Sequence, residues 1–363
     1  MRIKLPMRMV LPKYFLFLLF LVSLSGTGAR AQQPAAAEAE ALVKQGVASG
    51  TKGDIDAAIA AFDQAIKIDP QYVPAYQDRG YAFTLQNKLE EAISDYDKAI
   101  QLDPNYAPAY LNRGRAFSRQ NKLEAAITDY DKAIELDPKN ADAYYYRVEA
   151  KGRLGDYDAA IADSSRVLEL QPQSAPAYYD RGHAKYFKGD LDGATSDLNQ
   201  VIVLSPSFAP GYFIRGLVRH AQGDGQGAGF DFQSSADNGF YYGAFWLWIV
   251  KMEGSERGLA RQTLSDYAAK PGFFKNDTWA SLMADFLLEK ITPEQLMAKA
   301  QQLGVTNDRL GEAWFYIGMD KYFSGDLPGA RDCFKKTIAI GAKGSEEVVE
   351  AQREAAKLQT SGL

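Results

Sequence analysis

The feature that most constrains this chain is a segment that recurs every 34 residues. The stretches DQAIKIDPQYVPAY, DKAIQLDPNYAPAY and DKAIELDPKNADAY begin at Asp63, Asp97 and Asp131. A fixed period of this length is typical of a solenoid, in which each repeat packs mainly on its neighbours. Numbered from the start of its first helix, the repeat begins at residues 39, 73, 107, 141, 175 and 209, with a separated copy at 311.

Small, aromatic and proline residues occupy fixed positions of the repeat and predict a pair of antiparallel helices. Position 8 is glycine in every copy except the fourth, which has Val148, and position 20 is always alanine. Small residues there let two helices approach closely. Position 4 is aromatic from the second copy onward, and position 24 often is, which supplies buried area. Proline at position 32 of the first five copies prevents the second helix from continuing.

Together these positions resemble the tetratricopeptide repeat family, over residues 39–242 and 311–344. The resemblance implies an all-α fold, a right-handed superhelical solenoid of helix pairs. We expect six repeats over 39–242, a helical insert over 243–310, a seventh repeat over 311–344, and a C-terminal capping helix and tail over 345–363. The length therefore indicates one array rather than two domains.

The insert departs from the period but still has the pattern of helices. Its start, Tyr241–Val250, is the most apolar stretch after the N-terminal segment, and at ten residues it predicts a buried helix rather than a membrane span. Asn276, Asp277 and Thr278 are typical of a helix cap, before a face of apolar residues that begins at Trp279. Thr292 followed by proline predicts another helix start. After the last repeat, Ser345–Leu358 predicts a polar amphipathic helix, as expected of a solenoid cap.

The first 31 residues have the order of a secretory signal peptide. Basic residues precede an apolar run of 11 residues, and small residues follow up to Ala29-Arg30-Ala31. We expect cleavage after Ala31, a short linker over 32–38, and a periplasmic or secreted protein without stable membrane insertion. An uncleaved anchor is the alternative. No cysteine follows the apolar run, so we expect no attached lipid.

Composition narrows the functional classes. Acidic residues outnumber basic ones by 46 to 41, and loss of five basic residues with the signal shifts the net charge from −5 to −10, which disfavours nucleic-acid binding. One cysteine (Cys333) and two histidines leave little material for a disulfide framework or a metal site. The run Gly223–Gly229 lies on a predicted turn with no strand before it, which disfavours a phosphate-binding loop. We therefore expect no enzymatic activity and no cofactor.

A charged pair recurs within repeats two to six. Position 7 is arginine and position 23 is aspartate in these five copies, while the first and last copies lack both residues. Pairing to the next repeat would leave Arg79 without a partner, because the first repeat has Ala61 at position 23. We interpret the pairs as structural clasps between the two helices, rather than as five binding sites. The predicted pairs are Arg79 with Asp95, Arg113 with Asp129, Arg147 with Asp163, Arg181 with Asp197, and Arg215 with Asp231.

Resemblance to the family places positions 5, 9, 12 and 13 of each first helix on the concave surface of the solenoid. Tyrosine and arginine there are typical interface anchors and suit a peptide with apolar anchors and acidic character. The alternative is that the tyrosines only cover the inner face. The two histidines are interpreted as lining rather than as metal ligands. The predicted partner-binding residues are Tyr81, Leu111, Arg115, Arg119, Tyr145, Arg153, Tyr179, His183, Tyr186, Phe213 and His220.

A second resemblance covers about the last 120 residues, in the segments at Phe245–Ile249, Ile291–Ala300 and Trp314–Ala342. Their order is similar to the NlpI type of bacterial periplasmic repeat protein. This resemblance implies a dimeric adaptor of the cell envelope that brings peptidoglycan hydrolases to a processing protease. This sequence lacks the lipid-bearing cysteine of that type and has more regular repeats at the front. A scaffold for assembling an envelope machine, such as a pilus or an exopolysaccharide exporter, is the alternative function.

Overall fold

A computed structural model describes residues 32–274, 277–340 and 345–360. These residues form nineteen helices and no strand, which confirms the all-α prediction. The helices belong to two compact units, residues 32–150 and residues 151–360, which we describe one at a time. The predicted signal peptide, residues 1–31, lies outside the described residues.

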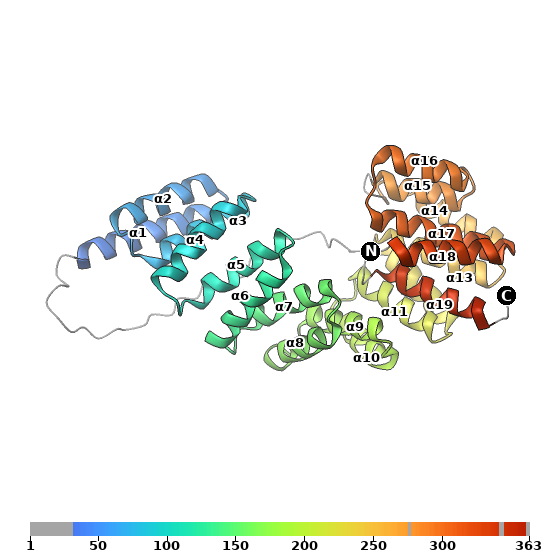
Figure 1. Ribbon diagram of the computed structural model, residues 1–363, viewed down its shortest axis with the longest axis horizontal. Coiled ribbons are helices and arrows are strands. Elements are labelled where there is room, and N and C mark those ends of the chain that lie inside the picture. The colour runs from blue at the N-terminus through green and yellow to red at the C-terminus, as the bar shows by residue number, and fades with distance from the viewer. Residues whose placement is uncertain (1–31, 275–276, 341–344, 361–363) are drawn as a thin grey trace. The chain divides into compact units, whose positions relative to one another are not determined.

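The unit of residues 32–150 contains three complete helical hairpins, which follow one another along the chain (Figure 1). The second and third hairpins begin where the 34-residue period predicts, at Val73 and Ala107. The first begins earlier than predicted, because residues 32–38 continue the first helix instead of forming a linker. Its alanines and glutamate have high helix propensity, which accounts for the difference. The helices are α1 (Gln32–Thr51), α2 (Ile55–Ile68), α3 (Val73–Leu85), α4 (Leu89–Leu102), α5 (Ala107–Arg119), α6 (Leu123–Leu136) and α7 (Ala141–Leu154), whose last turn passes into the second unit.

The unit of residues 151–360 continues the repeats, then departs from them and returns. The hairpins of repeats five and six begin at Ala175 and Ala209, as the period predicts, whereas α17 begins four residues before residue 311. The helices are α8 (Tyr157–Leu170), α9 (Ala175–Lys188), α10 (Leu191–Leu204), α11 (Ala209–Ala221), α12 (Gly225–Asp237), α13 (Tyr241–Glu253), α14 (Arg257–Ala268), α15 (Thr278–Leu287), α16 (Pro293–Leu303), α17 (Asn307–Ser324), α18 (Leu327–Ile340) and α19 (Glu346–Thr360).

The predicted helices of the insert are confirmed. The apolar stretch at its start forms α13, whose residues 242–249 are buried. Asp277 caps α15 by accepting from the amides of Trp279 and Ala280 at 2.9 and 3.2 Å. Thr292 and Gln295 form a reciprocal capping box at the start of α16. Among the described residues, no helix has both the length and the apolar character needed to cross a bilayer.

In every repeat with an aromatic ring at position 24, that ring requires the glycine at position 8 of the same hairpin. A β-carbon added to Gly114 would lie 2.6 Å from the Tyr130 ring, and one added to Gly318 would lie 2.6 Å from Phe334. Both distances are far inside van der Waals contact, so the ring occupies the space that a side chain would need. The predicted close approach of the two helices is confirmed. The ring at position 24 is what excludes a larger side chain at position 8.

A hydroxyl group joins consecutive repeats in the first unit. The tyrosine at position 4 donates to the carbonyl of the proline six residues before it, as Tyr110 does to Pro104 at 3.1 Å. The same bond forms from Tyr76 and from Tyr144. The position that the sequence marked as a buried aromatic therefore also satisfies a carbonyl beyond the end of the preceding helix.

The core differs between the two units. Residues 32–150 contain several small clusters, each confined to one or two hairpins. Residues 151–360 contain one continuous cluster, built around large side chains such as Trp246, Phe232 and Phe315. Trp246 lies against both rings, with centroids 5.5 and 5.7 Å away, and so joins the sixth repeat to the seventh.

Candidate protein-binding surface

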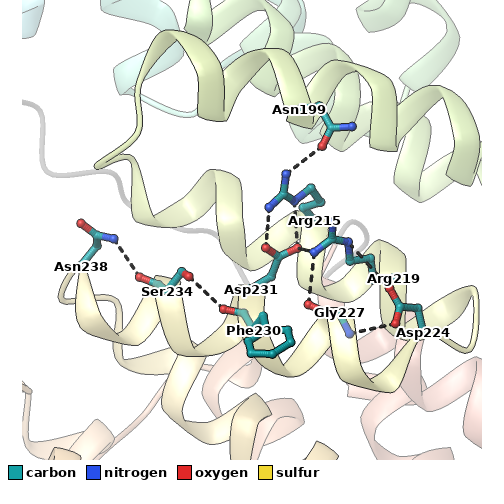
Figure 2. Close-up of polar contacts among 9 residues, drawn as sticks. All are labelled: Asn199, Arg215, Arg219, Asp224, Gly227, Phe230, Asp231, Ser234 and Asn238. Carbon is teal, nitrogen blue, oxygen red and sulfur yellow. Dashed lines mark hydrogen bonds and ion pairs between the residues drawn. The ribbon is translucent and has the colours of Figure 1, made fainter.

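The predicted clasps form within the hairpins of repeats two, three, five and six. In each, the arginine donates from Nε and one terminal nitrogen to both oxygens of the aspartate, at 2.6 to 2.9 Å. Such two-point bonds are the strongest geometry for this pair. Figure 2 shows the clasp of repeat six, where Arg215 holds Asp231. For repeat four, Arg147 lies in the first unit and Asp163 in the second, so their pairing stays a prediction.

Each clasp arginine also reaches the preceding repeat, which the sequence interpretation missed. The remaining terminal nitrogen of Arg79 donates to Asp63 at 2.6 Å, and Arg113 donates to Asp97 in the same way. Arg147 likewise reaches Asp131 at 2.5 Å. These acceptors lie 16 residues before the arginine, as far before it as the clasp aspartate lies after it. The sequence did contain a signal for this second contact, because Asp63, Asp97 and Asp131 are the first residues of the recurring segments.

Repeats four to six add a second cation to the clasp aspartate. Lys151 donates to Asp163, Lys185 to Asp197 and Arg219 to Asp231, at 2.8 to 2.9 Å. All three cations occupy position 11, where repeats two and three have phenylalanine. In those repeats the ring lies near the clasp arginine instead, as Phe83 lies 5.9 Å from Arg79. The clasp is therefore more polar in the second unit.

Burial and pairing have different effects on the pKa values of the two members of a clasp. The bond to Asp95 is the main cause that raises the pKa of Arg79 above its ordinary value. Burial raises the pKa of Asp95 more than its bond to Arg79 lowers it. The difference follows from exposure, because the arginine side chain is 21% exposed and that of the aspartate only 7%. The clasp is a partly buried pair, so losing one member would leave a charge in a poorly solvated place.

An open aromatic surface lies on the first helices of residues 73–150. The Arg115 guanidinium lies 4.6 Å from the centre of the Tyr146 ring, and Tyr145 packs edge-on against Tyr146 at 5.5 Å. Burial raises the pKa of Tyr146 and the Arg115 charge lowers it, while the charges of Asp142, Glu149 and Tyr81 also raise it. Tyr81 and Tyr145 are half-buried, so each ring keeps a solvent-facing part.

Apolar and basic groups extend this surface. Leu85 is 40% exposed, and Leu111 is half-buried. Arg119 donates to the carbonyl of Thr84 at 2.6 Å and to the side chain of Asn87 at 2.9 Å. Arg119 therefore ties repeat three to repeat two, so its predicted role in partner binding is shared with a structural one. Arg153 is half-buried near the end of α7.

The predicted surface on α9 and α11 is covered by the chain itself. Tyr186 has no exposed surface, and its hydroxyl donates to Glu350 of α19. His183 Nε2 lies 3.1 Å from Glu346 of the same helix. His220 lies within 2.9 Å of Glu253 and 4.0 Å of Glu350.

We therefore revise the prediction that this part of the surface is open to a partner. Tyr179 and Phe213 are also buried, at 6% and 2% exposure, against Phe208 and Phe240. The repeat pattern could place these side chains on one face. It could not reveal that a helix more than 120 residues later would cover that face, because no periodic signal links the two segments.

The remaining motifs have structural contacts. In the glycine-rich run, Asp224 caps α12 by accepting from the Gly227 amide at 2.8 Å, and Arg219 donates to the Gly227 carbonyl (Figure 2). Cys333 is buried, and burial raises its thiol pKa. The described part of the chain holds no group of three His, Cys, Asp or Glu side chains arranged for a metal ion. Its surfaces can supply aromatic contacts and hydrogen bonds to a partner.

These features define a class, the helical repeat proteins whose hairpins stack into a solenoid. Within that class, a family model described as TPR repeat matches residues 51–84, 80–121 and 114–155, and a second, described as tetratricopeptide repeat, matches residues 141–174. The chain is a tetratricopeptide repeat protein. The fold of this class is suited to protein binding and to non-enzymatic scaffolding. No curated protein matches the sequence.

Solved structures support the fold assignment. A tetratricopeptide repeat protein from Parabacteroides merdae has a TM-score of 0.51 at 19% identity, over 69% of this chain and 98% of its own. PilF of Pseudomonas aeruginosa has a TM-score of 0.50 at 16% identity, over 56% of this chain and 91% of its own. YrrB, described as a TPR protein with an unusual peptide-binding site, has a TM-score of 0.45 at 24% identity, over 49% and 92%. The first two show a shared fold, and the NlpI-type resemblance stays a prediction.

Proposed function

We propose that this protein is a non-enzymatic adaptor that binds protein partners through the aromatic surface on the first helices of residues 73–150. One observation carries the proposal: the half-buried Tyr81, Arg115 and Tyr145 and the exposed Leu85 lie on three successive first helices, α3, α5 and α7. Tyrosine and arginine are the side chains that most often dominate interface energetics. Several such anchors on one rigid array of hairpins suit an extended or helical segment of a partner.

The aromatic rings and Arg115 of this surface favour a partner segment with apolar anchors and some acidic character. Arg115 lies against Tyr146 and still has solvent-facing surface, so it can meet a carboxylate at the rim of an interface. An adaptor of this kind acts by raising the effective concentration of two bound proteins near each other. We place it in the bacterial cell envelope, in the periplasm or outside the cell, on the signal-like order of residues 1–31. An envelope protease and peptidoglycan hydrolases are the partners proposed from the resemblance at the C-terminal end.

Affinity capture tests the proposal. The chain from residue 32 onward is immobilised and exposed to a bacterial envelope extract, and the bound proteins are identified by mass spectrometry. The same capture is run with Tyr81→Ala combined with Tyr145→Ala. We expect the double variant to keep its helical circular dichroism and to lose the specifically captured proteins.

The control replaces exposed residues on the second helices of the same hairpins. Ser94→Ala combined with Thr128→Ala changes equivalent positions on α4 and α6 that are exposed to solvent. This variant should capture the same proteins as the unaltered chain. Equal capture by all three chains would show that the aromatic surface is not the binding site.

A further inference from the structure

Helix α19 presents its acidic side to the protein, and none of its exposed positions carries an acidic residue. All four of its glutamates, Glu346, Glu347, Glu350 and Glu354, are buried, with 1 to 3% exposure. Its exposed positions are occupied by two glutamines, an alanine and a lysine. A solenoid cap ordinarily has a polar outer face over an apolar inner one, whereas the inner face of α19 carries four carboxylates.

The acidic side of α19 meets donors on the concave face of α9 and α11. Glu350 accepts from the Tyr186 hydroxyl and from Arg353 of its own helix, and it lies 4.0 Å from His220. Arg353 also donates to the Tyr186 hydroxyl at 3.2 Å and lies over the ring, 4.9 Å from its centre. One turn earlier, Glu346 meets His183. His183 and Tyr186 therefore meet two successive turns of α19. His220, which is bonded to Glu253, lies beside the second of these turns.

Closing a groove with buried carboxylates costs more free energy than closing it with apolar side chains. Taking a carboxylate out of water costs several kcal/mol before its partners repay it, and apolar side chains of similar size would cover the same face at lower cost. Ala351 and Leu358 do bury apolar surface on α19, at 0% and 4% exposure. The contact therefore combines a small apolar part with two carboxylate acceptors, Glu346 and Glu350.

We propose that the concave face of α9 and α11 is a binding site for an acidic amphipathic helix. Helix α19 is its resident occupant, and an acidic helical segment of a partner protein takes its place. The defining residues are His183, Tyr186 and His220. Because α19 is tethered, its effective concentration at the site is on the order of millimolar, so a free helix binds well only where α19 has been weakened. This site is separate from the surface at Tyr81 and Tyr145 and does not rest on it.

Binding of a free helix tests the proposal. The probe is a fluorescent peptide with the sequence of residues 345–360, and its binding is followed by fluorescence anisotropy. The proteins are the unaltered chain, a variant with Glu346→Gln and Glu350→Gln, and a control with Gln352→Lys, an exposed position of the same helix. We expect the Gln variant to bind the peptide about tenfold tighter than the other two proteins. If the double variant does not fold, Glu350→Gln alone serves.

Two further measurements make the result specific. A peptide in which the four glutamates are glutamine should bind the weakened variant at least about tenfold less tightly, and adding Tyr186→Phe to that variant should reduce binding of the acidic peptide. Equal binding of both peptides, or no binding by any variant, would overturn the proposal. So would a dimeric mass for the weakened variant in light scattering, since a second copy would then be the occupant. None of these outcomes alters capture at Tyr81 and Tyr145.

Discussion

The two units use the same 34-residue hairpin but treat its concave face differently. In residues 32–150 the core is a series of small clusters, and Tyr81 and Tyr145 of the aromatic surface are only half-buried. In residues 151–360 the core is continuous, and the equivalent face on α9 and α11 lies under α19. The comparison teaches that the repeated positions specify the hairpin and its clasp, while the concave positions are free to bind another segment.

The clasps follow the same division. Repeats two and three place phenylalanine at position 11, beside the clasp arginine, whereas repeats four to six place a second cation there. The hairpin tolerates both solutions because the bond between positions 7 and 23 is kept. Local polarity can therefore change from one unit to the other without changing the repeat.

The largest expected effect on stability is the difference between replacing the covered Tyr186 and replacing the half-buried Tyr81. Tyr186→Ala removes a fully buried ring and its bond to Glu350, so it should destabilise residues 151–360 by about 3–5 kcal/mol. Tyr81→Ala truncates a half-buried ring and should cost about 1 kcal/mol. Urea unfolding followed by circular dichroism measures both. Similar costs for the two variants would remove the distinction between the faces.

Breaking a clasp is the next largest effect. Arg113→Ala leaves Asp129 buried without its two-point partner, so we expect a loss of about 1–4 kcal/mol of unfolding free energy. Lys132→Ala is the control, because its ion pair with Glu135 is exposed and should contribute less than about 1 kcal/mol. Thermal and urea unfolding compare the two variants. A clasp variant as stable as the control would refute the structural role.

Replacing either of two glycines in equivalent helices by alanine should change the free energy of unfolding, in opposite directions. Gly114→Ala drives a β-carbon against the Tyr130 ring and should destabilise the first unit by about 1–3 kcal/mol. Gly152 has no neighbouring atom within 4 Å of an added β-carbon, so Gly152→Ala should stabilise the chain by about 0.5–1 kcal/mol. The same unfolding assay is used for both variants. A stabilised Gly114→Ala variant would mean that the aromatic knob does not fix this position.

The second unit should also carry a pH dependence of its own. Burial, together with the nearby charge of Glu347, raises the pKa of Glu312 from an ordinary value of 4.5 to about 8. Because the pKa is higher in the folded state, the stabilisation is complete below pH 4.5 and is lost as the pH rises through 8. The slope for one proton is at most about 1.4 kcal/mol per pH unit.

Glu312→Gln isolates this effect, because glutamine resembles the protonated side chain that accepts from Trp279 at 3.0 Å. Unfolding free energies measured between pH 5 and pH 8 should fall less steeply for the variant than for the unaltered chain. The control is Glu289→Gln, an exposed position, which should keep the slope. An unchanged slope in Glu312→Gln would show that another group titrates.

The repeat could be predicted from the sequence because each of its features has a local cause. Proline at position 32 ends a helix, an aromatic ring demands glycine at position 8, and an arginine needs its aspartate 16 residues away. The contacts of α19 have no local cause of this kind in the sequence. Its glutamates look like the solvated side of a helix until the tyrosine and histidines that receive them are seen in space. Tertiary packing decides which distant helix covers a face of the repeats, and the repeat period in the sequence carries no information about it.

The most direct test of this account is a double-mutant cycle between Tyr186 and Glu350. Unfolding free energies are measured for the unaltered chain, for Tyr186→Phe, for Glu350→Gln, and for the two changes together. If the hydroxyl and the carboxylate are bonded in the covered face, the two changes are not additive, and the coupling energy should be about 1–3 kcal/mol. Additive costs, within about 0.5 kcal/mol, would mean that α19 does not occupy the concave face of α9.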